Sequence, residues 1–107
     1  MVPSATVRII HNGKSIQEAA WGDGPVDAAY RAINRATGLT PELENYSIRA
    51  VTGSSEALGE AVVRIKQGDK IFAGHGVSTD IIEASAKAYI NALNHMLTRS
   101  QGNQNEE

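Results

Sequence analysis

Hydrophobic and polar residues alternate over several short stretches of the chain, and each such stretch predicts a β-strand. The first stretch is Thr6 to His11, and the second runs from Ser15 to Trp21 after an Asn12-Gly13 turn. Because Asn-Gly accepts the positive φ angles of a two-residue hairpin, these two strands are predicted to pair antiparallel. Three further strands are predicted at 46–53, 61–67 and 70–75.

Two other stretches place apolar residues at the spacing of an α-helix. The first helix is predicted to begin at Pro25, whose missing N–H costs nothing there, and to end before Gly38 and Pro41. The second is predicted to begin near Asp80, which forms a capping-box spacing with Glu83. The stripes predicted to face a sheet are Val26, Ala29, Tyr30 and Ile33, and Ile82, Ala86, Tyr89, Leu93 and Met96 or Leu97.

The element order is therefore ββα followed by βββα, which predicts an α+β fold with an antiparallel sheet and two helices on one face. A shift of 56 positions superposes Val7-Arg8-Ile9 on Val63-Arg64-Ile65 and Asp27-Ala28 on Glu83-Ala84. This favours a degenerate duplication of a strand–helix unit, although any two α+β halves share part of such a pattern. The other sheet face has no predicted cover, so we expect a homodimer.

Composition narrows the function classes. The chain has 107 residues, with 10 basic, 12 acidic and no cysteine residues, which predicts one domain with a modest core. A net charge of −2 provides no long-range attraction to nucleic acid or to an anionic membrane. No apolar run approaches the roughly 20 residues needed to span a bilayer. The lack of cysteine suits a cytoplasmic location.

The residue types that carry catalysis are scattered along the chain. The three histidines, His11, His75 and His95, lack the short spacings typical of metal ligands. The sequence contains no nucleophile elbow and no P-loop. No catalytic residue and no metal site is therefore predicted, and a small stand-alone enzyme is the least supported function class.

Each predicted helix begins beside a glycine-containing segment, Gly22-x-Gly24 or Gly74-x-Gly76. A helix N-terminus presents unpaired N–H groups and a partial positive charge, which attract a carboxylate. Acids also lie at both starts: Asp23 and Asp27, and Asp80 and Glu83. N–H donors beside carboxylates suit a zwitterion, whereas the acids would repel a phosphate. Ordinary helix caps explain the same acids, so both interpretations stay open on spacing alone.

Four motifs carry a family resemblance. They are G-D-G-P-V-D-A-A-Y-R-A-I-N at 22–34, Y-S-I-R-A-V-T-G at 46–53, A-L-G-E-A at 57–61 and G-H-G-V-S-T-D-I-I-E-A-S-A-K-A-Y at 74–89. In this order and spacing they resemble the C-terminal regulatory domain of 2-isopropylmalate synthase. The resemblance covers residues 4 to about 98.

The resemblance implies a dimeric, pseudo-symmetric domain that binds leucine, the end product of the pathway, for feedback inhibition. Carried over by motif, the effector-binding residues are Gly22, Asp23, Gly24, Pro25, Val26, Ala28, Tyr46, Ala50, Ala57, Thr79, Asp80 and Ile81. The family's divalent metal belongs to a catalytic barrel that joins acetyl-CoA to 3-methyl-2-oxobutanoate. Because 107 residues are too few for that barrel, no cofactor is expected in this domain.

The resemblance also sets the expected organisation and partners. Residues 1–3 are expected to be a start added at a domain boundary, 4–99 the regulatory amino-acid-binding domain and 100–107 a disordered polar tail. As an excised domain or a free-standing relative, the chain is expected to be non-catalytic by itself and cytoplasmic. Its expected partners are leucine, a second copy and the catalytic barrel, with neither nucleic acid nor membrane. The alternatives are an isoleucine-binding domain of citramalate synthase and a dimerisation module without ligand.

Overall fold

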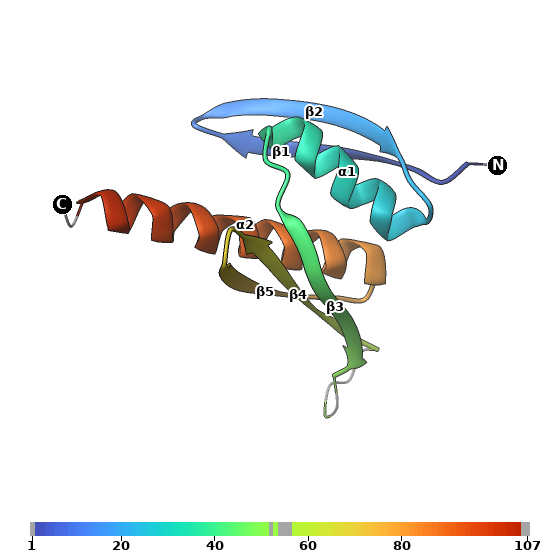
Figure 1. Cartoon of the computed structure of the whole chain (residues 1–107). Helices are drawn as coiled ribbons and strands as arrows, with labels where there is room; N and C mark the ends of the chain where they lie inside the picture. Colours follow the sequence, from blue (N-terminus) through green and yellow to red (C-terminus); the bar gives the residue numbers. More distant parts are fainter. Residues whose placement is uncertain (1, 52, 54–56, 106–107) are drawn as a thin grey trace. The chain divides into compact units, whose positions relative to one another are not determined.

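A computed structural model describes residues 2–51, 53 and 57–105 of the chain (Figure 1). Its elements are β1 (Ser4–His11), β2 (Lys14–Trp21), α1 (Pro25–Thr37), β3 (Glu42–Ala50), β4 (Gly59–Gln67), β5 (Lys70–Ser78) and α2 (Ile81–Asn105). The predicted α+β class and the element order are confirmed. The structure divides into two compact units, Met1–Thr40 and Pro41–Glu107, here called unit 1 and unit 2.

Unit 1 begins with a two-residue hairpin. β1 and β2 pair antiparallel with His11 opposite Lys14, so Asn12 and Gly13 form the turn. Their φ angles are 52° and 79°, which is the left-handed conformation that Asn-Gly adopts most readily in such a turn. Figure 1 shows α1 lying along this hairpin, and α1 contacts both strands.

The ends of α1 follow the predicted signals. Pro25 occupies the first turn, and the Gly38 N–H donates to the Asn34 carbonyl at 2.8 Å with a Gly38 φ of 74°. The helix therefore ends in a left-handed glycine cap. Its buried face contains three alanines, Ala28, Ala29 and Ala32, together with the larger side chains of Tyr30 and Ile33.

Unit 2 is a three-stranded antiparallel sheet in the order β3-β4-β5, with α2 on one face. α2 packs mainly on β5 and β4 (Figure 1). The alternate β4 residues Ala61, Val63 and Ile65 are fully buried. On the same face, the Tyr46 hydroxyl of β3 lies 2.9 Å from Ser85 Oγ in α2, which ties the edge strand to the helix.

Two glycines allow β5 and α2 to approach backbone to backbone. A Cβ at Gly74 would lie 2.1 Å from the Ala88 carbonyl oxygen and 2.4 Å from the Ala92 nitrogen. At Gly76 it would lie 2.2 Å from the Ala84 carbonyl oxygen. Any side chain at either glycine therefore requires the helix to move away from the strand.

This close approach changes which residues of α2 are buried. Tyr89 and Leu93 are buried as predicted, but Ile82 is 39% exposed, so its assignment to the stripe is wrong. The small residues Ala84, Ala88 and Ala92 take the central positions against the two glycines. Ala86, also placed in the stripe, is half-buried.

Two expectations about the architecture require correction. The described strands form two separate sheets, β1-β2 and β3-β4-β5, where one sheet was predicted. Alternation identifies strands but does not say which edges pair, so the sequence left this undetermined. Beyond the predicted domain end, α2 extends to Asn105 where a disordered tail was expected. Adding residues to a helix already formed costs little compared with nucleating one.

The two units repeat the same order of elements. At the 56-residue offset noted in the sequence, β1 corresponds to β4, β2 to β5, and the first residue of α1, Pro25, to that of α2, Ile81. The residues that precede the two helices, Gly24 and Asp80, also correspond. β3 has no counterpart among the described strands of unit 1. The element bounds therefore support the predicted duplication, with one strand added to unit 2.

Candidate functional site

The start of α2 is capped by the side chain of Asp80. Its Oδ1 accepts the Ile82 N–H at 2.8 Å and the Glu83 N–H at 3.3 Å. Glu83 forms an ion pair with Lys87 at 3.0 Å, and the Asp80 N–H donates to Ser78 Oγ at 3.1 Å. Asp80 is therefore the N-cap residue, as predicted. In a capping box the glutamate accepts the backbone N–H of the N-cap residue, and here the Ser78 hydroxyl accepts it instead.

An open pocket of about 430 Å³ adjoins this helix start. Its lining residues come from the ends of β3 and β4, the segment between them and the α2 N-terminus: Ile48, Arg49, Ala50, Val51, Ala57, Leu58, Gly59, Thr79 and Ile81. Ala50 pairs with Gly59 and Ile48 pairs with Ala61, which is buried under α2. Since paired residues share a sheet face, Ile48, Ala50 and Gly59 lie on the face that α2 covers.

Four of the predicted effector residues line this pocket: Ala50, Ala57, Thr79 and Ile81. Asp80 lies between two of them, and its carboxylate caps the helix. Tyr46 does not line the pocket. Its hydroxyl contacts Ser85 one turn into α2, so Tyr46 holds β3 against the helix.

Sequence reasoning missed five lining residues: Ile48, Arg49, Val51, Leu58 and Gly59. Ile48 could have been predicted from the alternation of the strand, because residues two apart share a sheet face and Ile48 lies two residues before Ala50. Leu58 and Gly59 belong to the A-L-G-E-A motif, of which only Ala57 was selected. Alternation alone did not indicate that the end of β3 and the start of β4 lie beside the start of α2.

Two charged side chains near the pocket, Arg49 and Glu60, compensate each other. The Arg49 guanidinium forms an ion pair with Glu60, whose side chain is only 17% exposed. His75 Nδ1 lies 4.0 Å from the same carboxylate. Because Glu60 compensates the charge of Arg49, aliphatic contact dominates the pocket lining.

The start of α1 is built differently. Gly24 precedes the helix without a side-chain cap, and the Asp23 N–H donates to Asp27 Oδ2 at 2.8 Å. A Cβ at Gly22 would lie 2.4 Å from the Ala28 nitrogen. Ala28 is fully buried, so its side chain belongs to the core of this unit.

The remaining predicted residues of this group, Pro25 and Val26, form the first turn of α1. Six predicted effector residues lie in unit 1 and six lie in unit 2. The structure describes each unit by itself, so a pocket shared by both groups stays a prediction.

The second glycine motif does not form a helix-start turn. Gly74 and Gly76 lie inside β5, several residues before α2. Their small size serves close packing on the helix, which corrects the interpretation that this motif opens α2. The residues that connect β5 to α2 are Thr79 and Asp80.

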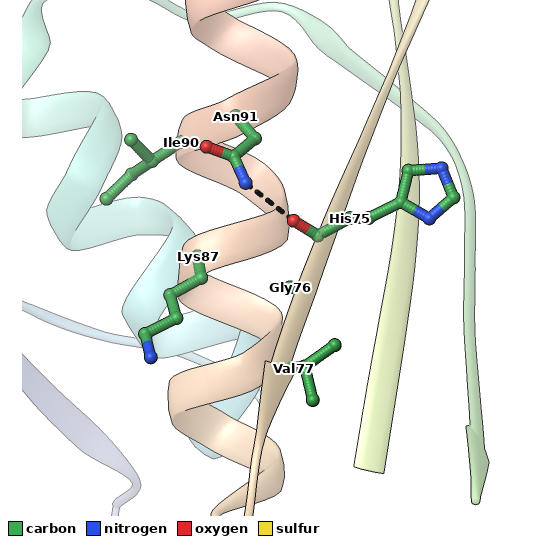
Figure 2. Close-up of a pocket in the computed structure, with 6 residues that line it drawn as sticks. All are labelled: His75, Gly76, Val77, Lys87, Ile90 and Asn91. Carbon is green, nitrogen blue, oxygen red and sulfur yellow. Dashed lines mark hydrogen bonds between the residues drawn. The ribbon is translucent and has the colours of Figure 1, made fainter. Parts of the chain in front are cut away.

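A second hollow of about 370 Å³ lies along β5 and α2 and is shown in Figure 2. The Asn91 amide points at the strand and donates to the His75 carbonyl at 2.6 Å, whereas the His75 ring points away from the helix (Figure 2). One turn later, His95 Nδ1 lies 2.6 Å from the Ala73 carbonyl, which can only accept a hydrogen bond. Side chains of α2 therefore satisfy the outward carbonyls of β5.

Within residues 2–51, 53 and 57–105, no group of three histidine and acidic side chains is placed to hold a metal ion. Within the same residues, no helix is both long and apolar enough to cross a membrane. The predictions that this domain carries no cofactor and lies in the cytoplasm stay predictions.

A repeated order of strands and helix, with an open, largely aliphatic pocket beside the second helix start, defines the class as a small α+β domain with a candidate ligand site. The chain belongs to the family of LeuA allosteric (dimerisation) domains, whose family model matches residues 1–97. The resemblance seen in the motifs is thereby confirmed.

The chain is similar to several proteins named 2-isopropylmalate synthase. It is 60% identical over 98 residues to that of Carboxydothermus hydrogenoformans, covering 91% of this chain and 19% of the relative. It is 53% identical to that of Ruminiclostridium cellulolyticum and 50% identical to that of Brevibacillus brevis, covering 92% of this chain and 19% of each relative. The chain thus spans about a fifth of the length of these relatives.

Proposed function

We propose that this chain is the leucine-binding feedback regulatory domain of a 2-isopropylmalate synthase and acts as a homodimer. The observation that carries the proposal is the pocket at the start of α2, in a member of an allosteric domain family. The relatives' name supports leucine biosynthesis as the pathway, and the end product of that pathway is the natural feedback signal.

The chemistry of the pocket suits an aliphatic amino acid. Ile48, Leu58 and Ile81 provide contacts for a branched side chain, and Ala50 leaves space between them. The exposed Asp80 carboxylate attracts an ammonium group. Because the same carboxylate already accepts the Ile82 and Glu83 N–H groups, a ligand carboxylate is attracted to this helix start only by the part of the helix dipole that the cap leaves uncompensated.

Calorimetric titration of the chain with leucine, isoleucine and valine tests the proposal. We expect leucine to bind more tightly than either of the other two. Tighter isoleucine binding supports the alternative, a citramalate synthase regulatory domain. If the intact dimer binds none of the three amino acids, the proposal is contradicted. The second alternative, a dimerisation module without ligand, is then supported.

The Asp80→Asn variant tests the role of the charge at the helix start. Asparagine is also a good N-cap, so the melting temperature without ligand is expected to change little. The stabilisation by leucine, about 2.7 kcal/mol for the wild type at 100 times the dissociation constant, should fall sharply. Differential scanning fluorimetry with and without leucine measures both quantities.

The exposed Asp69 in the β4–β5 turn provides the control, since Asp69→Asn makes the same chemical change away from the pocket. Equal stabilisation by leucine in both variants would exclude a role for the Asp80 charge.

We also propose that the domain is non-catalytic alone and joins a catalytic barrel in the full enzyme. Condensation of acetyl-CoA with 3-methyl-2-oxobutanoate releases a free thiol, which a colorimetric thiol reagent detects. The chain has no cysteine, so the protein contributes no background. We expect no thiol release, with or without added divalent metal, and sustained release would refute this part of the proposal.

A further inference from the structure

One glycine in the pocket at the α2 start differs from the glycines that pack on helices. A Cβ built on Gly59 would lie 3.6 Å from Ile81 Cγ1 and 3.8 Å from the Ser78 carbonyl oxygen. Both are ordinary van der Waals distances, whereas Gly74 and Gly76 leave their Cβ positions blocked at 2.1 and 2.2 Å. The fold therefore accepts a side chain at Gly59 without moving an element.

The direction of that absent side chain is set by the strand register. Gly59 pairs with Ala50 on one side and Ser78 on the other, and both Gly59 and Ala50 line the pocket. Its Cβ would approach Ile81, which lines the pocket from the helix. A methyl group at Gly59 would thus occupy pocket space between the sheet and the first residue of α2.

We infer that Gly59 sets the upper size limit for the ligand's side chain in this pocket, with Ile81 as the opposing wall. The inference rests on the proposed function, because it assigns the pocket to an aliphatic amino acid. It adds a specificity-determining residue that folding alone does not require. One extra or missing methylene in an apolar pocket changes binding by about tenfold or more, so a single methyl group is enough to select.

The experiment compares the wild type and Gly59→Ala by calorimetric titration with leucine, valine and alanine. Thermal unfolding of both proteins gives their melting temperatures. We expect an unchanged melting temperature, a dissociation constant for leucine raised about tenfold, and a smaller change for valine and alanine. Ser47→Ala is the control, because Ser47 is exposed and pairs with Val62 on the other sheet face. It should bind as the wild type does.

Two further variants make the steric argument specific. Ile81→Ala in the Gly59→Ala background removes the Cγ1 atom that would face the new methyl group and should restore leucine binding. Ile81→Ala alone enlarges the pocket and should admit methionine or phenylalanine. Ile81 is 50% exposed, so these changes leave the core intact and remain informative if Gly59→Ala fails to fold.

The outcomes separate the two levels of the proposal. If the wild type binds none of the amino acids, the proposed function fails and the inference fails with it. If the wild type binds leucine and Gly59→Ala binds it equally well, the inference alone is overturned. An equal loss of affinity for leucine, valine and alanine also overturns it, because a size limit must distinguish them.

Discussion

At the scale of single residues, the glycines of this chain have different physical roles that only the structure separates. Gly74 lies where the backbones of β5 and α2 meet, whereas a Cβ at Gly59 would line the pocket in ordinary van der Waals contact with Ile81. Both are strand residues in the same sheet. A change from glycine to alanine should therefore lower the stability at Gly74 and leave it nearly unchanged at Gly59.

We expect Gly74→Ala to lower the free energy of unfolding by about 3 kcal/mol, because its Cβ would lie 2.1 Å from the Ala88 carbonyl oxygen. Gly59→Ala is the matched control and should remain within about 0.5 kcal/mol of the wild type. Urea unfolding followed by circular dichroism measures both. Equal midpoints for the two variants would show that α2 moves away from β5 at little cost.

The sequence predicted the turn residues correctly and the glycine motifs only in part. Asn12-Gly13 and Gly38 have local roles that depend on their own φ angles, so the sequence identifies them. Gly74 and Gly76 depend on a helix that follows them and folds back onto the strand, which no local pattern reveals. For the same reason Gly59 was missed as a lining residue, because its exposure depends on where α2 begins over the sheet.

At the scale of elements, α2 covers the free edge of β5 as well as the face of the sheet. The Asn91 amide and the His95 ring bond the carbonyls of His75 and Ala73, which point away from β4. An uncovered strand edge is a template for pairing with another chain. The two side chains are one turn apart on the helix and thus satisfy alternate carbonyls of the strand.

Replacing both side chains should open this edge. For Asn91→Ala combined with His95→Ala, we expect a loss of roughly 1–3 kcal/mol of stability, since each hydrogen bond contributes about 0.5–1.5 kcal/mol. Light scattering at high protein concentration should also show increased aggregation through the β5 edge. Asn94→Ala, an exposed change on the same helix, is the control. If the double variant matches this control in both measurements, the two hydrogen bonds do not protect the edge.

The elements themselves were largely predictable, and their pairing was not. The β4–β5 hairpin and both helix starts lie close to their predicted positions, because alternation, proline and capping signals are local. β3 begins at Glu42, earlier than the predicted Tyr46, since residues 42–45 contain a single apolar residue, Leu43, which is too little alternation to indicate a strand. The division into two sheets depends on long-range pairing, for which the sequence contains no direct signal.

At the scale of the whole molecule, the duplication explains why the two helix starts differ. The helices begin 56 residues apart, but only unit 2 has a described third strand, and that strand supplies Ile48 and Ala50 to the pocket. Gly24 occupies the position of Asp80 and leaves α1 without a side-chain cap. The two units thus share the same element order, but only unit 2 combines a helix start capped by a side chain with a three-stranded sheet.

The repeated units also place Trp21 and Val77 at equivalent positions, 56 residues apart. Both side chains lie on the sheet face opposite the helix of their own unit, and they are 70% and 41% exposed. Apolar groups at such positions favour association, as the family's dimerisation domains imply. We therefore expect sedimentation equilibrium to give twice the chain mass of 11.4 kDa.

If the dimer buries these faces, Val77→Lys should shift the sedimentation mass towards one chain, because a buried unpaired lysine is costly. Thr98→Lys, which adds the same charge at an exposed position of α2, should leave the dimer intact. Trp21 is the only tryptophan, so its fluorescence reports on unit 1 independently and should shift to shorter wavelength as the wild type associates. A mass of one chain at all concentrations would contradict the dimer. A dimer unaffected by Val77→Lys, with unchanged tryptophan emission, would place the interface on other surfaces of the two units.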